Sequence, residues 1–124
     1  MASIEITKEN FNSTIENNDI VILDFWAEWC GPCRNFGPVF ERASEQYPNI
    51  VFGKIDTEAQ QEIAASYNIR SIPTLMVFRE QIILYSEAGA LPPAHFQQLI
   101  DQVLSLDMDD VRRQIAEEQA KEGK

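Results

Sequence analysis

The sequence has little of several features that would fix its class. It has no apolar run near the roughly 20 residues that a membrane-spanning helix needs. Its first residues, MASIEITK, have neither the basic nor the apolar stretch of a signal peptide. Cations are scarce, with 10 Lys and Arg against 20 Asp and Glu, which gives a formal net charge of -10. Because this charge repels phosphate backbones and anionic lipid, we expect a soluble, cytoplasmic protein with no nucleic-acid or membrane partner.

Cysteine and histidine are also scarce, with two Cys and one His in the chain. Cys30 and Cys33 are three positions apart, and a disulfide that closes so short a loop constrains the unfolded chain very little. In an intracellular protein such a pair is chemical more often than structural. Two thiolates are half of a tetrahedral zinc site, so a zinc site would need a second copy of the chain, and no metal is expected. His95 is interpreted as a surface residue.

The 124 residues suit one domain, and a hydrophobic content of 44% is enough for a core. Residues 20–26 (IVILDFW) are almost continuously apolar, which is typical of a strand covered on both faces. Other strands are predicted at 4–6, 50–55, 73–78 and 82–86, and helices after an N-cap at Thr7, over 30–47 and 57–67, and from Pro92. This alternation implies parallel strands, and the late hairpin adds antiparallel ones. The predicted class is α/β, with a central mixed sheet of about five strands flanked by about four helices.

The end of the chain differs in character from the rest. The predicted domain covers residues 1–104, and residues 105–124 are expected to form a C-terminal helical extension or tail. Its apolar residues recur at helical spacing in a thin stripe: Leu104, Met108, Val111 and Ile115. Asp109 and Arg113 form one of two i, i+4 charge pairs that support a helix. A solvated helical tail is favoured over a partner-binding helix.

Cys30 and Cys33 follow the buried run and open the predicted helix. Cys30 would then lie at the helix N-terminus, where unpaired backbone N–H groups and the helix dipole favour an anion. This position favours the thiolate, which is the reactive form of cysteine. Cys33 is one turn further on, within reach of the Cys30 sulfur. Pro32 fits the first turn and stiffens the loop.

The surrounding residues form an ordered set: Asp24, WAEWCGPC at 26–33, Pro38, Lys54, Ile72-Pro73-Thr74 and Gly89. In this set and order the chain resembles the thioredoxin family from about Ile4 to Leu104. The resemblance implies a thioredoxin fold and a protein-disulfide reductase. Cys30 would attack a client disulfide as the nucleophile, and Cys33, expected to be the more buried of the two, would resolve the mixed disulfide. The Gly-Pro pair between the cysteines resembles that of the reducing members.

The resemblance also implies roles for other residues. Asp24 is expected to accept or relay a proton for Cys33 and Lys54 to tune Asp24, with a purely electrostatic Asp24–Lys54 pair as the alternative. Pro73 is expected to follow a cis bond, which would leave the Ile72 backbone free to pair with a client, with a strand-edge proline as the alternative. Trp26 is interpreted as core packing. The residues expected to contact the client are Trp29, Gly31, Pro32, Ile72, Pro73, Gly89 and Ala90.

The resemblance implies no bound cofactor. The redox-active disulfide Cys30–Cys33 would receive electrons indirectly from NADPH through a thioredoxin-reductase-like reductase. The expected partners are this reductase and disulfide-containing client proteins, and the chain is expected to act as a monomer. A competing interpretation is a binding module that uses the fold as a structural or chaperone-like subunit. The acidity and the tail favour it, whereas Asp24, Pro73 and the intact cysteine pair argue against it.

Overall fold

The computed structural model describes residues 2–123. Its elements are β1 (Ile4–Glu5), α1 (Phe11–Asn17), β2 (Ile20–Trp26), α2 (Gly31–Gln46), β3 (Val51–Asp56), α3 (Gln61–Ser66), β4 (Thr74–Arg79), β5 (Ile82–Ala88), α4 (Pro93–Ser105) and α5 (Met108–Glu122). The order of strands and helices is the predicted one. Residues 1 and 124, the outer ends of the two predicted ranges, lie outside the described residues. Within those residues, every helix is too short or too polar to cross a membrane.

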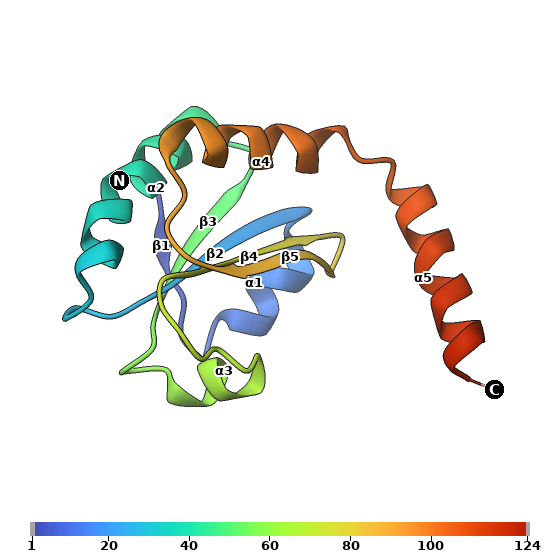
Figure 1. Cartoon of the computed structure of the whole chain (residues 1–124), viewed down its shortest axis with the longest axis horizontal. Helices are drawn as coiled ribbons and strands as arrows, with labels where there is room; N and C mark the ends of the chain where they lie inside the picture. The colour runs from blue at the N-terminus through green and yellow to red at the C-terminus, as the bar shows by residue number, and fades with distance from the viewer. Residues whose placement is uncertain (1, 124) are drawn as a thin grey trace.

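The five strands form one mixed sheet in the order β1-β3-β2-β4-β5. β2 runs parallel to β3 and antiparallel to β4, and β4 and β5 form an antiparallel hairpin. β2 is therefore the central strand. The helices α1 and α3 cover one face of the sheet, and α2 and α4 cover the other (Figure 1). The predicted α/β architecture is confirmed.

β2 is buried because its side chains alternate between two cores. The core under α1 and α3 includes Phe11, Ile15, Val21, Leu23, Phe25 and Ile63. The core under α2 and α4 includes Ile20, Ile22, Phe36, Phe40, Phe96 and Ile100. Asp24 shares the face of Ile20 and Ile22 because it follows them at even spacing along the strand. The only acidic residue of the central strand therefore points to the side that α2 covers.

Two helices begin later than predicted. Thr7 is not the N-cap of α1: its carbonyl accepts from the N–H groups of Asn10 and Phe11, so it belongs to a turn before the helix. α3 begins at Gln61 rather than at residue 57, because an Asp56 carboxylate oxygen accepts from the Glu58 N–H at 2.9 Å and holds a turn there. Both differences come from local side-chain and turn contacts, which compete with helix formation.

The predicted C-terminal extension is a separate helix, α5. The carboxylate of Asp107 caps it by accepting from the backbone N–H groups of Asp109, at 3.0 Å, and Asp110, at 3.3 Å. Met108 is buried, whereas Leu104 is 44% exposed, so the predicted apolar stripe is only partly covered. In Figure 1, α2 begins at the left of the molecule and α5 lies at the right. The extension therefore leaves the start of α2 open.

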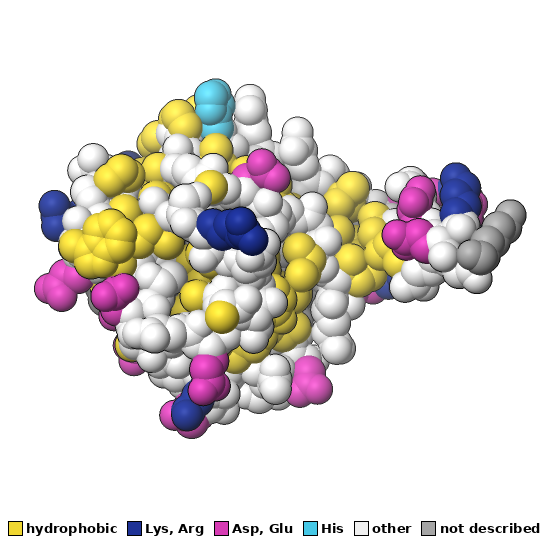
Figure 2. Space-filling view, turned by 60° about the horizontal axis from the view of Figure 1, so that its bottom comes forward, with side chains coloured by type: hydrophobic (Ala, Val, Ile, Leu, Met, Phe, Trp, Pro, Cys, Tyr) yellow, Lys and Arg dark blue, Asp and Glu magenta, His cyan; other side chains and the backbone are white. Residues whose placement is uncertain are grey.

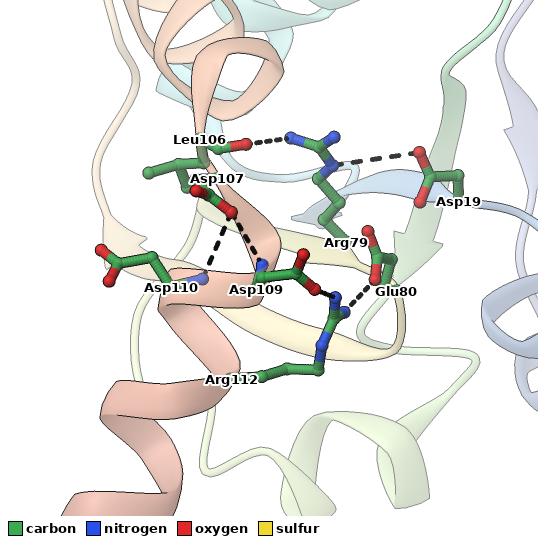
Figure 3. A network of polar contacts seen from close by, with 8 residues as sticks. All are labelled: Asp19, Arg79, Glu80, Leu106, Asp107, Asp109, Asp110 and Arg112. Atoms are coloured by element: carbon green, nitrogen blue, oxygen red, sulfur yellow. Dashed lines mark hydrogen bonds and ion pairs between the residues drawn. The ribbon is translucent and has the colours of Figure 1, made fainter.

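Polar contacts with the β4–β5 turn fasten α5 to the body (Figure 3). Arg79 donates to the carbonyl of Leu106 at 3.2 Å, just beyond the end of α4. Arg112 of α5 pairs with Glu80 in the turn and with Asp109. The predicted i, i+4 pair of Asp109 with Arg113 is therefore wrong: Asp109 pairs with Arg112, and Arg113 pairs with Asp110, each three positions along the helix. The backbone of Glu80 has a positive φ of 52°, which is uncommon for a residue with a side chain.

Gly53 in β3 lies where the core has no room for a side chain. A Cβ atom there would be 2.5 Å from Cγ1 of Ile6 and 3.1 Å from Cδ2 of Leu23. We predict that Gly53→Ala lowers the free energy of unfolding by about 1–3 kcal/mol, because the two buried neighbours must shift. Urea unfolding measures this. Gly37→Ala is the control, since its Cβ would meet only the Lys54 Nζ at 4.0 Å. Equal stabilities of the two variants would contradict the prediction.

Candidate active site

The two cysteines lie where β2 leads into α2. Cys30 is the N-cap of α2 and Cys33 is in its first turn, and the two form a disulfide with Cα atoms 5.2 Å apart. The Cys30 Sγ accepts from the backbone N–H of Cys33 at 3.2 Å. In the dithiol form, the same N–H group and the positive end of the helix dipole stabilise a thiolate on Cys30. The arrangement therefore suits thiol chemistry at Cys30.

The two cysteines are equally buried, each with 4% of its surface exposed. The prediction that Cys33 is the more buried one is therefore wrong for this disulfide form. The bond holds both sulfurs together in one small apolar cluster with Ala27, against which Trp26 and Ile72 pack. In this disulfide form the two residues therefore have the same exposed fraction, although Cys30 is the N-cap and Cys33 lies in the first turn.

Asp24 is fully buried under α2, opposite Lys54 in the parallel ladder of β2 and β3. Neither carboxylate oxygen has a hydrogen-bond partner among residues 2–123. Burial raises the pKa of Asp24 from 3.8 to about 7, and the positive charge of Lys54 partly opposes this rise. No ion pair within 4.0 Å joins these two described side chains. The structure therefore shows a lone buried carboxylate near a cation, rather than the direct pair.

Lys54 is placed by a contact that the sequence did not reveal. Its Nζ lies 4.9 Å from the centroid of the Trp26 ring, within the range of a cation–π contact. Both side chains line an open hollow of about 460 Å³ beside Pro38. Trp26 is only half-buried, so it packs against the core, as predicted, and also contacts Lys54 at the surface. The available signal was strand alternation, which puts Trp26 and Asp24 on the same face of β2.

One loop distant in sequence contacts Cys30, and a second loop is hydrogen-bonded to the first. The Ile72–Pro73 peptide bond is cis, as expected, and the Ile72 carbonyl oxygen lies 3.7 Å from the Cys30 Sγ. The Gly89 N–H donates to the Pro73 carbonyl at 2.8 Å, which ties the end of β5 to this loop. Gly89 has a φ of +112°, a conformation that favours glycine.

The surface around the cysteines is open. Trp29 is 67% exposed, and Pro32, Gly89 and Ala90 are also exposed. Figure 2 shows hydrophobic side chains at the end of the molecule away from α5, and others across the middle of this face and at the start of α5. His95 is exposed on α4, as expected. In the part of the chain that the structure describes, no group of three or more His, Cys, Asp or Glu side chains could hold a metal ion.

Comparison with known proteins identifies the family. The family model named Thioredoxin matches residues 2–102. The chain belongs to the thioredoxin family. It is a thiol-disulfide oxidoreductase of the protein-disulfide reductase type, with a redox-active disulfide between Cys30 and Cys33.

Other thioredoxins share both sequence and fold with this one. "Putative thioredoxin 2" of Streptomyces coelicolor is 54% identical over 122 residues, which cover 98% of this chain and 91% of that protein. "Thioredoxin C-3" of Corynebacterium nephridii is 44% identical over 102 residues, 82% of this chain and 70% of that one. Because the first match leaves only two residues unmatched, it includes α5.

Solved thioredoxin structures have the same fold. The thioredoxin of Plasmodium falciparum superposes with a TM-score of 0.74 and 36% identity, over 81% of this chain and 97% of that one. A mutant thioredoxin from Halobacterium salinarum gives a TM-score of 0.78 and 29% identity, over 86% and 95% of the two chains. The predicted thioredoxin fold is confirmed.

The raised pKa of Asp24 makes stability depend on pH. The folded state holds this proton more tightly than the unfolded chain, so the free energy of unfolding falls as the pH rises from about 4 to about 7. We predict that Asp24→Asn removes this fall and stabilises the oxidised protein by about 4 kcal/mol at pH 8, with little effect at pH 4.

Urea unfolding from pH 4 to pH 8 measures this difference. Glu45→Gln, a change of an exposed acidic residue on the same α2 side of the sheet, is the control and should follow the wild type at every pH. An Asp24→Asn curve parallel to that of the wild type would show that the Asp24 proton does not control this stability.

Proposed function

We propose that this thioredoxin works as a reductant of client disulfides, with Cys30 as the nucleophile and Cys33 as the resolving residue. The observation that carries the assignment is the N-cap position of Cys30. Its sulfur faces the first free N–H groups of α2 and the open Ile72 carbonyl, whereas Cys33 lies inside the helix. The thiolate is therefore stabilised on Cys30, at the end of the helix, rather than on Cys33.

The exchange moves two electrons from the cysteine pair to the client. The Cys30 thiolate attacks one client sulfur, the client S–S bond breaks, and one client thiolate leaves. Cys33 then loses its proton and attacks the Cys30 sulfur of the mixed disulfide. The Cys30–Cys33 bond forms, and the second client thiolate leaves. The protein ends oxidised, and the client holds two reduced cysteines.

Asp24 is the proposed acceptor for the Cys33 proton. Its buried carboxylate lies on the sheet face covered by α2, the helix that carries Cys33 in its first turn, and its pKa of about 7 suits proton transfer at neutral pH. Lys54 keeps the Asp24 pKa from rising further, and its position on the open hollow gives a route toward solvent. Both residues therefore act in resolution rather than in the first attack.

The proposed client surface surrounds Cys30. Trp29 supplies an exposed aromatic contact, and the Ile72 backbone lies outside the ladder of β4, which begins at Thr74. An extended client segment can therefore pair with Ile72 by strand addition. The remaining exposed or half-buried residues of the surface are Gly31, Pro32, Gly89 and Ala90. Pro73, also expected to contact the client, is buried in this disulfide form, so its proposed part is to hold the Ile72 loop in place.

A thioredoxin-reductase-like reductase, drawing electrons from NADPH, is the proposed source of electrons for the Cys30–Cys33 disulfide. The protein would thereby take part in electron transport to clients in the cytoplasm, where disulfides are kept reduced. We propose that it does so as a monomer, without a bound cofactor. We also retain the division into a domain at 1–104 and an extension at 105–124.

Cysteine variants test the two-step scheme. We predict that Cys30→Ser abolishes insulin reduction with dithiothreitol as the electron source, because the attacking sulfur is lost. Cys33→Ser should retain the attack and accumulate mixed disulfides with clients, because nothing resolves them. The measurements are insulin B-chain precipitation and thiol-releasable capture of proteins. Wild-type activity no faster than the dithiothreitol background, or no captured partners with Cys33→Ser, would overturn the scheme.

The role of Asp24 has a separate kinetic test. We predict that Asp24→Asn slows release of the reduced client several-fold at pH 7 and little at pH 9, where Cys33 loses its proton without help. Stopped-flow decay of a mixed disulfide from pH 6 to pH 9 measures this. The same relative rate at every pH would exclude Asp24 as the proton acceptor.

A further inference from the structure

An open cleft of about 390 Å³ lies beside the cysteines, between Trp29 and the segment from Ile69 to Ile72. The residues that line it are Trp29, Thr57, Ile69, Arg70, Ser71 and Ile72. Arg70 is the one charged residue of this lining. A client segment in the cleft would therefore meet a single cation on an otherwise uncharged surface.

The positive charge of Arg70 has no ion-pair partner among residues 2–123. Its side chain is exposed, and no carboxylate of residues 2–123 lies within 4.0 Å of it. Arg79, Arg112 and Arg113 pair with carboxylates, whereas Arg34 and Arg42, like Arg70, have no ion pair among residues 2–123. Of these three unpaired arginines, only Arg70 lines the cleft. In a chain with twice as many acidic as basic residues, 20 against 10, an arginine without such a partner at the client cleft is available to a ligand.

Asn68 fixes the guanidinium of Arg70. The Arg70 Nε donates to the Asn68 Oδ1 at 3.1 Å. Asn68 follows the end of α3 and has a φ of 55°, a backbone conformation that glycine adopts with the least strain. Glycine would end the helix equally well but could not hold Arg70. The side chain of Asn68 therefore has a use that helix termination alone does not explain.

The position of Arg70 relative to Cys30 determines which client residue would interact with the Arg70 charge. Arg70 is two residues before Ile72, whose carbonyl oxygen lies 3.7 Å from the Cys30 Sγ. Residues 71–73 form a bend before β4, so the pairing contact is the Ile72 backbone alone. A client strand that pairs there advances about 3.3 Å per residue, and side chains two positions apart lie on the same face. A client side chain two positions from its reactive cysteine is thus within the reach of the Arg70 side chain.

We propose that Arg70, held by Asn68, selects clients that carry an acidic residue two positions from the reactive cysteine. This inference rests on the proposed function, since it assumes that Cys30 attacks a client lying along Ile72. The net charge of -10 repels acidic clients at long range, so the preference operates only at short range in the cleft. An exposed charge pair of this kind corresponds to a preference of roughly two- to fivefold.

The test uses peptides with one cysteine whose sulfur carries a 5-thio-2-nitrobenzoate group. Glu, Gln or Lys stands two positions to either side of the cysteine, and a control peptide has Glu five positions away. The second-order rate of thionitrobenzoate release by the reduced protein is divided by the rate with dithiothreitol, which removes the peptide's own reactivity. The wild type should react two- to fivefold faster with Glu at one of the near positions than with the distant Glu, a peptide of the same net charge.

Three variants test whether Arg70 and Asn68 cause the preference for Glu. Arg70→Gln should abolish the preference, Asn68→Gly should reduce it while the fold is retained, and Arg113→Gln on α5 should leave it unchanged. The same Glu preference in Arg70→Gln as in the wild type would overturn the inference and leave the proposed function standing. Release no faster than that of Cys30→Ser with every peptide would overturn the proposed function, and the inference with it.

Discussion

The junction between β2 and α2 is the constraint on which the rest of the site depends. β2 is the central strand and is buried between two cores, so the point where the chain leaves it is fixed. α2 is anchored over the sheet by Phe36 and Phe40, which are almost fully buried. The first N–H groups of α2 consequently meet the sulfur of Cys30 in a defined geometry. A cysteine away from a helix N-terminus would lack this stabilised anionic position.

The same packing creates the thermodynamic weakness of the molecule. Asp24 lies in the central strand without a hydrogen-bond partner, and its charged form is therefore disfavoured inside the protein. Lys54 opposes this effect from the neighbouring strand, and the Trp26 ring keeps its ammonium nearby. An apolar residue at position 24 would pack more favourably, so the carboxylate is retained at the expense of stability. Such a cost is typical of a group whose ionisation is part of the chemistry.

The redox site and the C-terminal helix lie at opposite ends of the molecule. The cysteines, Trp29 and the Arg70 cleft lie at the start of α2, whereas α5 is fastened to the β4–β5 turn at the other end (Figures 1 and 3). Arg112 and Glu80 make that attachment at the end opposite the start of α2. The addition of α5 therefore leaves access to the redox site unchanged. The Streptomyces relative matches this chain through α5, so the extension is a feature that the two proteins share.

The sequence alone determined the elements, their order and the redox pair, because apolar periodicity, turn residues and the CxxC spacing are local properties. It also indicated Asp24, since one carboxylate within an apolar run is visible without a structure. Two contacts depend instead on strand order and register, which bring together residues far apart in sequence. They are the cation–π contact of Lys54 with Trp26 and the backbone hydrogen bond from Gly89 to Pro73. The equal burial of the two cysteines likewise depends on the neighbours that cover their disulfide. These features were decided by the tertiary structure, because only the folded chain determines which side chains distant in sequence are in contact.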